Sequence, residues 1–166
     1  MPPPTPTGHL AVAATIWLTL ALWFASVACQ LSGQPRLWRS ARWLWIAAAA
    51  VYLIHVAAAF HVYHHWSHQE AFDFVQDQAG FGPGIFITYA FTGLWAADAL
   101  WWWAAPASRD RRPLWLAFLL HGFMVFILFN GAVIFAAGPV RWLSLAGFLV
   151  LAGLGLWTQR RLFLPR

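Results

Sequence analysis

The stretch "LWLAFLLHGFMVFILFNGAVIFAAGPV", residues 114–140, decides the class of the protein. It contains no charged side chain, and His121 and Asn130 are its strongly polar ones. About 20 consecutive apolar residues are enough to cross a bilayer as a helix. The stretch therefore predicts a transmembrane helix, and it excludes a soluble globular core for this part of the chain.

The composition of the whole chain agrees with that prediction. Of its 166 residues, 61% are hydrophobic and 9% are charged, whereas a soluble domain carries about 25% charged residues. We predict an all-α fold, an integral membrane bundle of five transmembrane helices in a single membrane domain, 1–166. The predicted helices cover residues 9–31, 42–65, 83–105, 114–137 and 140–158, with an outer loop at 66–82.

The arginines predict how the bundle is oriented. Short cytoplasmic loops are enriched in positive residues. Five spans place nine arginines on one side and leave Arg141 alone on the other. We therefore expect the N-terminus outside and the C-terminus in the cytoplasm, in the inner membrane of a bacterium. Eight tryptophans fall near the inner boundary, as an aromatic belt would: Trp38, Trp43, Trp45, Trp101, Trp102, Trp103, Trp115 and Trp157.

The kinds of charged and reactive residues exclude several functions. The net charge is +5, but every basic residue is an arginine and most flank apolar spans, so we expect lipid contact and no nucleic-acid binding. The chain has no lysine, which excludes a Schiff base with retinal or pyridoxal. Its one cysteine, Cys29, excludes a disulfide within the chain.

The segment "FHVYHHWSHQEAFDF", residues 60–74, concentrates the titratable side chains. If the second helix continues through residue 79, its four histidines fall within a sector of about 100°. Two imidazoles one turn apart on one helix are the spacing that binds a single metal ion. The carboxylates that follow lie on a different face unless the helix breaks near Ser67. The predicted metal ligands are His61, His64, His65 and His68.

Imidazole clusters of this kind are typical of zinc, copper and iron sites, and a histidine can also ligate haem iron. We therefore expect a transition metal or a haem on the extracytoplasmic side. The structural alternative is an interfacial segment whose histidines bind water, lipid headgroups or backbone. The pattern of residues 70–79 also predicts a short amphipathic helix lying on the outer surface.

Ionisable residues at membrane depth are costly and usually face a partner or a cavity. Asp98 and His121 both fall roughly 10–12 Å from the inner surface, at 1.5 Å per residue, on helices joined by a short connection. We predict that they form a hydrogen bond or an ion pair. Such a pair either holds the two helices together or has a functional role. The functional role is a step in a proton relay, or a carboxylate that orients a ligand histidine.

His55, Thr92 and Asn130 fall at a middle depth, between this pair and the outer histidines. Together these polar groups predict a ladder of His55, Asp98, His121 and Asn130, provided that the second, third and fourth helices pack together. The ladder is consistent with a proton path, and equally with unrelated polar contacts. His55 is also a candidate haem ligand, or a buried histidine bonded to a carbonyl or to Asn130.

Three functions follow from these features. The first is an integral membrane metal- or haem-binding protein with its histidine-rich site outside, part of a redox assembly. The second is a non-catalytic structural subunit of a larger membrane complex, with other membrane subunits as partners. The third is a proton or metal-ion conduit. The sequence does not specify a reaction, so whether the protein is an enzyme stays open.

Overall fold

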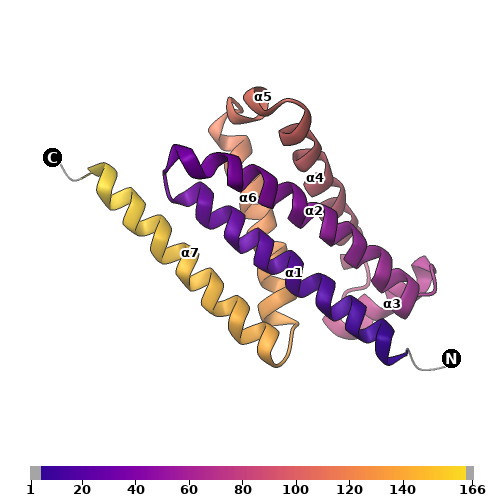
Figure 1. The fold of residues 1–166 in the computed structure, drawn as a ribbon. Coiled ribbons are helices and arrows are strands. Elements are labelled where there is room, and N and C mark those ends of the chain that lie inside the picture. Colours follow the sequence, from indigo (N-terminus) through magenta and orange to yellow (C-terminus); the bar gives the residue numbers. More distant parts are fainter. Residues whose placement is uncertain (1–4, 164–166) are drawn as a thin grey trace.

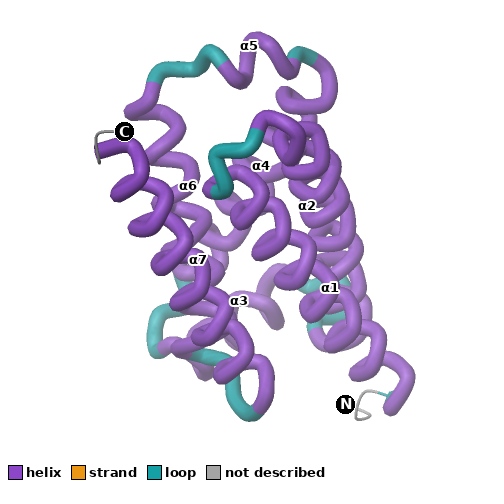
Figure 2. Tube along the Cα trace, turned by 60° about the vertical axis from the view of Figure 1, so that its left-hand side comes forward, coloured by secondary structure: helices purple, strands orange, loops and turns teal. Residues whose placement is uncertain are grey.

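The computed structural model describes residues 5–163 of the chain, and the side chains of residues up to 158. Within these residues all regular structure is helical, as Figure 2 shows. The elements are α1 (Pro6–Leu31), α2 (Pro35–Tyr63), α3 (His68–Ala79), α4 (Gly84–Ala104), α5 (Pro106–Asp110), α6 (Leu114–Phe129), the π-helix η1 (Asn130–Ile134) and α7 (Pro139–Phe163).

The long helices run back and forth between two ends of the bundle (Figures 1 and 2). We call one the arginine end; it holds the α1–α2 turn, α5 and the C-terminal part of α7. We call the other the histidine end; it holds the start of α1, α3 and the turn between η1 and α7. The chain passes between these two ends five times, in α1, α2, α4, α6 with η1, and α7. The first described residues therefore lie at the histidine end and the last at the arginine end.

Four of the helices are long and apolar enough to cross a membrane: Pro6–Leu31, Pro35–Tyr63, Leu114–Ile134 and Pro139–Thr158. The chain therefore has the character of a membrane protein, with apolar helices suited to lipid contact. The helix α4 is not among the four, and it contains Asp98 together with polar and aromatic residues that lower its hydropathy. Its 21 residues nevertheless extend for about 30 Å.

A column of aromatic rings fills the space between α2 and α4. Trp45 of α2 is completely buried, with ring centroids 5.9 Å from Trp95 and 6.3 Å from Trp102 of α4. Tyr52 stacks on Trp95 at 5.2 Å. Tilted and edge-to-face ring pairs of this kind contribute about 0.5–1.5 kcal/mol each beyond their buried area. The column fixes α2 against α4 along much of their length.

Local sequence explains where most helices begin and end. Proline occupies the first turn of α1, α2 and α5, where its missing N–H costs no hydrogen bond. Gly80 ends α3 with a left-handed φ of 71°, a conformation that glycine adopts without steric cost. The break between α3 and α4 is therefore encoded locally.

Several predicted boundaries differ from the structure. The second helix begins at Pro35 rather than 42, because helix-favouring arginines extend it beyond the apolar run. The predicted outer loop 66–82 contains α3, which agrees with the amphipathic helix expected over 70–79. The fourth helix changes to π-helical geometry at Asn130 and ends at Ile134, short of 137.

Candidate functional site

The histidine segment lies at a sharp break between α2 and α3. The first of these helices ends at Tyr63, and His64 is its C-terminal cap. His65 and Trp66 then adopt φ values of 46° and 62°, in the left-handed region that residues with a side chain adopt infrequently. The Ser67 hydroxyl accepts a hydrogen bond from the amide three residues on and starts α3. The condition of one continuous helix through residue 79 is therefore not met, and the histidines do not share one helical stripe.

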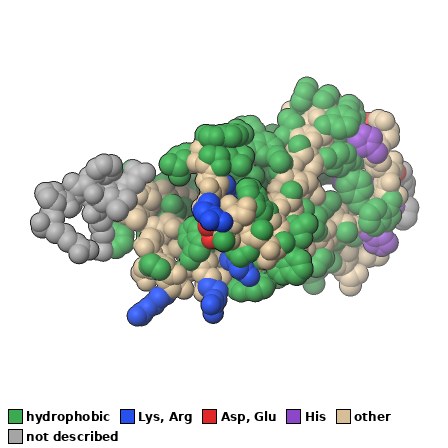
Figure 3. Space-filling view, turned by 90° about the horizontal axis from the view of Figure 1, so that it is seen from above, with side chains coloured by type: hydrophobic (Ala, Val, Ile, Leu, Met, Phe, Trp, Pro, Cys, Tyr) green, Lys and Arg blue, Asp and Glu red, His purple; other side chains and the backbone are tan. Residues whose placement is uncertain are grey.

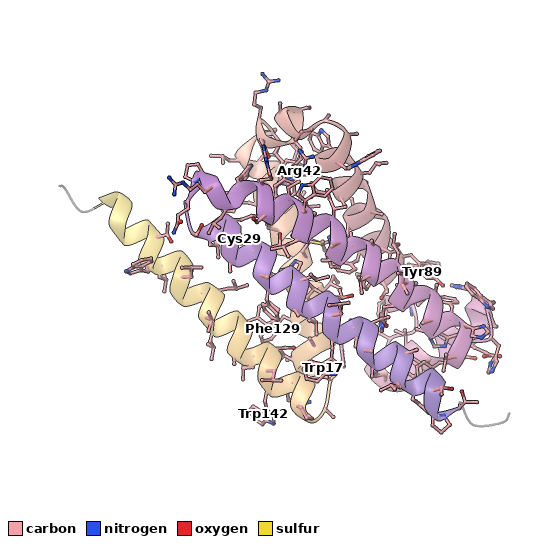
Figure 4. The ribbon with its side chains drawn as sticks, in the orientation of Figure 1. Trp17, Cys29, Arg42, Tyr89, Phe129 and Trp142 are labelled. Atoms are coloured by element: carbon pink, nitrogen blue, oxygen red, sulfur yellow. The ribbon has the colours of Figure 1, made fainter. Side chains whose placement is uncertain are left out.

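Three histidines at this end are held through Nδ1 by an oxygen of another side chain. The pairs are His9 with the Tyr63 hydroxyl at 2.7 Å, His65 with Glu70 at 2.9 Å, and His68 with the Tyr89 hydroxyl at 2.9 Å. Figure 4 labels Tyr89 on the side of α4 nearest α3. Because Nδ1 is engaged in each ring, Nε2 is the nitrogen left to meet a ligand.

The other two histidines of the segment have different surroundings. His64 is buried, with its ring 5.4 Å from Phe60 and 5.2 Å from Phe74. Burial lowers the pKa of His64 and the neighbouring His65 lowers it further, while Glu70 acts in the opposite direction. His61 is exposed and contacts no polar partner among the described residues. Of the four histidines around the break, His64 is therefore buried, and the other three are exposed.

The four predicted ligands do not form a complete metal site by themselves in this conformation. Among residues 5–158, no group of three histidine, cysteine, aspartate or glutamate side chains lies close enough together to hold a metal ion. Glu70 does join His65, as expected for a break near Ser67. A metal bound here would therefore need a ligand from elsewhere or a movement of the segment.

Asp98 belongs to a buried ionic network at the arginine end. Its carboxylate accepts hydrogen bonds from Arg109 Nε at 3.3 Å and Nη2 at 3.0 Å, and from Arg112 Nη1 at 3.0 Å. The side chains of Asp98 and Arg109 are 4% and 1% exposed, so the charges are almost fully withdrawn from solvent. Arg109 also lies over the Trp102 ring at 3.5 Å. In Figure 3 a small red carboxylate patch lies beside blue arginine side chains on this face, while Asp98 itself is buried.

The predicted direct pairing of Asp98 with His121 is not observed, because Arg112 lies between them. Its Nη2 atom is 3.5 Å from His121 Nδ1. The imidazole stacks on Trp45 at 5.3 Å, and its Nε2 lies 3.3 Å from Gln30 Oε1. His121 Nδ1 also lies 3.0 Å from the Ala117 carbonyl of its own helix, which accepts a hydrogen bond from a ring protonated at Nδ1. Both partners of the expected pair are thus engaged, but with the arginines and Gln30.

The middle part of the predicted ladder is not connected either. His55 Nδ1 lies 3.1 Å from the Val12 carbonyl and 3.2 Å from the Thr15 hydroxyl, both on α1. Asn130 donates instead to the Phe126 carbonyl of its own helix at 2.7 Å. His55 is therefore a histidine hydrogen-bonded to a backbone carbonyl, which is one of the alternatives that the sequence leaves open. Asn130 is not its partner.

Several partners of Asp98 and of the histidines are residues that the sequence does not identify as candidate site residues. Arg109 and Arg112 were assigned to membrane topology alone, yet they neutralise Asp98. A signal was available, because an aspartate at membrane depth needs a cation and these arginines follow directly after the proline turn. Tyr63, Tyr89 and Gln30 carry no comparable signal, because only the packing of distant helices brings them to the histidines.

The chain has no match among the protein-family models, curated proteins and solved structures with which it was compared. The geometry of its own residues is therefore the basis for the functional proposals below.

Proposed function

We propose that the chain is an integral membrane protein whose histidine end binds a transition metal ion or a haem iron on the extracytoplasmic side. The observation that carries the proposal is the set of three imidazoles held at Nδ1 by Glu70, Tyr63 and Tyr89. Metal-ligating histidines almost always have their second ring nitrogen fixed by a carboxylate, a carbonyl or water. A phenol hydroxyl is an oxygen partner of the same kind, so Nε2 is available to zinc, copper or iron.

The proposed orientation places the arginine end in the cytoplasm of a bacterium and the histidine end outside its inner membrane. Two features support five spans. The described chain enters at one end of the bundle and leaves at the other (Figure 1), and α4 packs along α2 with its one carboxylate neutralised by buried arginines. A paired charge of this kind lowers the cost of placing α4 in the bilayer.

We further propose that a second subunit of a membrane assembly completes the metal site. The support is that no three ligand groups of the described chain meet at the break, whereas protein metal sites commonly use three or four ligands. A histidine or carboxylate from a partner, or from a second copy of this chain, would supply what is missing. If the chain binds no metal, its alternative role is that of a non-catalytic structural subunit in the same assembly.

The experiment is metal analysis of the protein purified from its membrane together with the subunits that remain bound. We expect a stoichiometric metal, or an optical spectrum of haem, that is lost in the double variant His65→Ala, His68→Ala. Glu70→Gln removes the carboxylate from His65 and should weaken metal binding by about 10–100-fold. Asp77→Asn is the matched control, because this exposed residue lies on the same helix α3.

Two results would contradict the proposal. One is metal content and spectrum that are unchanged in the double variant. The other is purified assembly that contains neither metal nor haem and does not take up added zinc, copper or iron. For the topology, a fluorescent protein fused after the C-terminus should fluoresce, and an alkaline phosphatase fused within 80–83 should be active.

A further inference from the structure

A cavity of about 410 Å³ lies inside the bundle, midway along α2. Its walls come from five parts of the chain, namely α1, α2, α4, the α6–η1 segment and the start of α7. Tyr52, His55 and Phe91 line it together with aliphatic residues. The volume falls in the range of about 300–1,000 Å³ that is typical of small-molecule sites.

A second cavity of about 400 Å³ adjoins the first between α4 and the π-helix. Thr88, Ile127 and Gly131 line both cavities, so the two share a wall and form neighbouring chambers. The second chamber extends toward α3, where Val75 and Gln78 border it. The two chambers thus lie side by side, and the second is the nearer to the histidine end.

The π-helix η1 shapes this space. Asn130 to Ile134 leave α-helical geometry without a proline, and single π-helical turns occur frequently at functional sites. Gly131 lies within this turn, and a Cβ placed there would meet no atom within 4 Å. Gly131 thus contributes no side chain to the wall that the two chambers share.

The polar groups in the first chamber are few and well defined. His55 Nδ1 faces the Val12 carbonyl at 3.1 Å, which fixes the proton on Nδ1 and leaves Nε2 as an acceptor. Nε2 has no hydrogen-bond partner among the described residues. Thr92 donates its hydroxyl proton to the Thr88 carbonyl at 2.8 Å, so the Tyr52 hydroxyl donates to Thr92 at 3.3 Å and its oxygen is left as a second acceptor. The ring centroids of Tyr52 and His55 are 6.2 Å apart, so one small ring can meet both.

The rest of the lining restricts the chemistry of a ligand. The described residues around the two chambers include no arginine, aspartate or glutamate, so nothing there neutralises a phosphate or carboxylate. A plain acyl chain would leave His55 Nε2 unpaired. An uncharged ring that bears oxygen substituents, carried on an apolar tail, satisfies both the polar groups and the aliphatic walls.

We propose that these chambers bind a lipid-soluble quinone or quinol, with its ring against Tyr52 and His55 and its tail along the wall formed by α4 and η1. A quinol hydroxyl donates to His55 Nε2, and the Tyr52 oxygen accepts from the second quinol hydroxyl. Phe91, packed edge-to-face on Tyr52 at 5.2 Å, borders the ring site. This inference does not depend on metal binding at the histidine end.

The test measures binding of decylubiquinone and decylubiquinol to the detergent-purified protein by quenching of tryptophan fluorescence. Trp95 stacks on Tyr52, so a ring in the first chamber lies close to an indole. We expect saturable binding of one ligand per chain. Gly131→Leu should weaken it at least 10-fold by filling the shared wall, and His55→Phe should weaken quinol binding more than quinone binding.

Gly122→Leu is the matched control, because this glycine of α6 also has open space around its Cβ position but lines neither chamber. Thermal unfolding of each variant checks that the bundle remains folded, and Gly131→Ala provides a milder change if Gly131→Leu unfolds. Quenching that does not saturate, or that is equal in Gly131→Leu and Gly122→Leu, would overturn the proposal. So would equal affinity for dodecanol, measured by competition, because that probe has no ring.

Discussion

The two ends of the bundle treat their titratable residues in opposite ways. At the arginine end, Asp98 is buried and bonded to two guanidinium groups, one of which also covers Trp102. At the histidine end, the imidazoles sit around a break in the chain, and each of three keeps one nitrogen free. The polar groups of the first network are therefore paired with one another and stabilise the fold, whereas those of the second keep a nitrogen that can meet a ligand. The variants below test this contrast.

The largest effect is expected for Asp98→Ala at the arginine end. Removing one partner of a buried ion pair leaves uncompensated charge and typically costs about 3–5 kcal/mol. Unfolding of the detergent-purified protein by heat or denaturant measures the loss. Asp110→Ala is the control, because its carboxylate lies 4.0 Å from Arg109 and is far more exposed; its effect should stay below about 1 kcal/mol. Equal losses in both variants would contradict a special role for the buried network.

The next effect is expected for Gly82→Ala at the histidine end. A Cβ at Gly82 would overlap the ring of Phe72 on α3, so that helix must shift away from α4. Overpacking of this kind typically costs about 1–3 kcal/mol. Hydrogen exchange should show faster opening in α3 and little change at the arginine end. Gly93→Ala, which meets no atom within 4 Å, is the matched control. Faster exchange spread over the whole bundle would argue against independent ends.

A smaller effect is expected for Ser26→Ala, which removes a buried contact between α1 and α2. The Ser26 hydroxyl donates to the Ala41 carbonyl at 2.7 Å and accepts from Gln30 at 3.3 Å. Hydrogen bonds between helices in membrane proteins contribute about 0.6 kcal/mol on average. The same unfolding assay should therefore show a loss near that value. If Ser26→Ala lowered the free energy of unfolding as much as Asp98→Ala, the ionic network would not be the main polar contribution to stability at the arginine end.

The smallest effect is expected from pH at the histidine end. Burial lowers the pKa of His64 in the folded protein, so the unfolded segment binds a proton at a higher pH than the folded one. The stability contributed by neutral His64 is present above the ordinary histidine pKa of about 6.5 and decreases as the pH falls below it. The protection factors of the α3 amides, which correct for the intrinsic exchange rate at each pH, should therefore decrease below that pH. The dependence should shrink in His64→Phe, which retains the contacts with Phe60 and Phe74; an unchanged profile would exclude His64 as its source.

Sequence patterns were sufficient where a local physical rule acts. The apolar run after Pro113 predicted a membrane-length helix, and the polar–apolar pattern of 70–79 predicted the helix that becomes α3. The candidate site was only partly predictable. His65 and Glu70 meet because of a chain break without glycine, and Asp98 meets Arg109 rather than His121 because α5 folds back. Neither outcome follows from residue spacing on straight helices.

The order of the residues is enough to predict that this chain forms apolar helices of membrane length and that its arginines and histidines lie in different connections. These properties follow from side-chain hydropathy and helix periodicity, which act within one segment. The tertiary structure decided which polar groups meet, where α2 breaks and where the chambers lie beside the π-helix. Those outcomes depend on contacts between residues far apart in the chain, whose energies are set by how the helices pack.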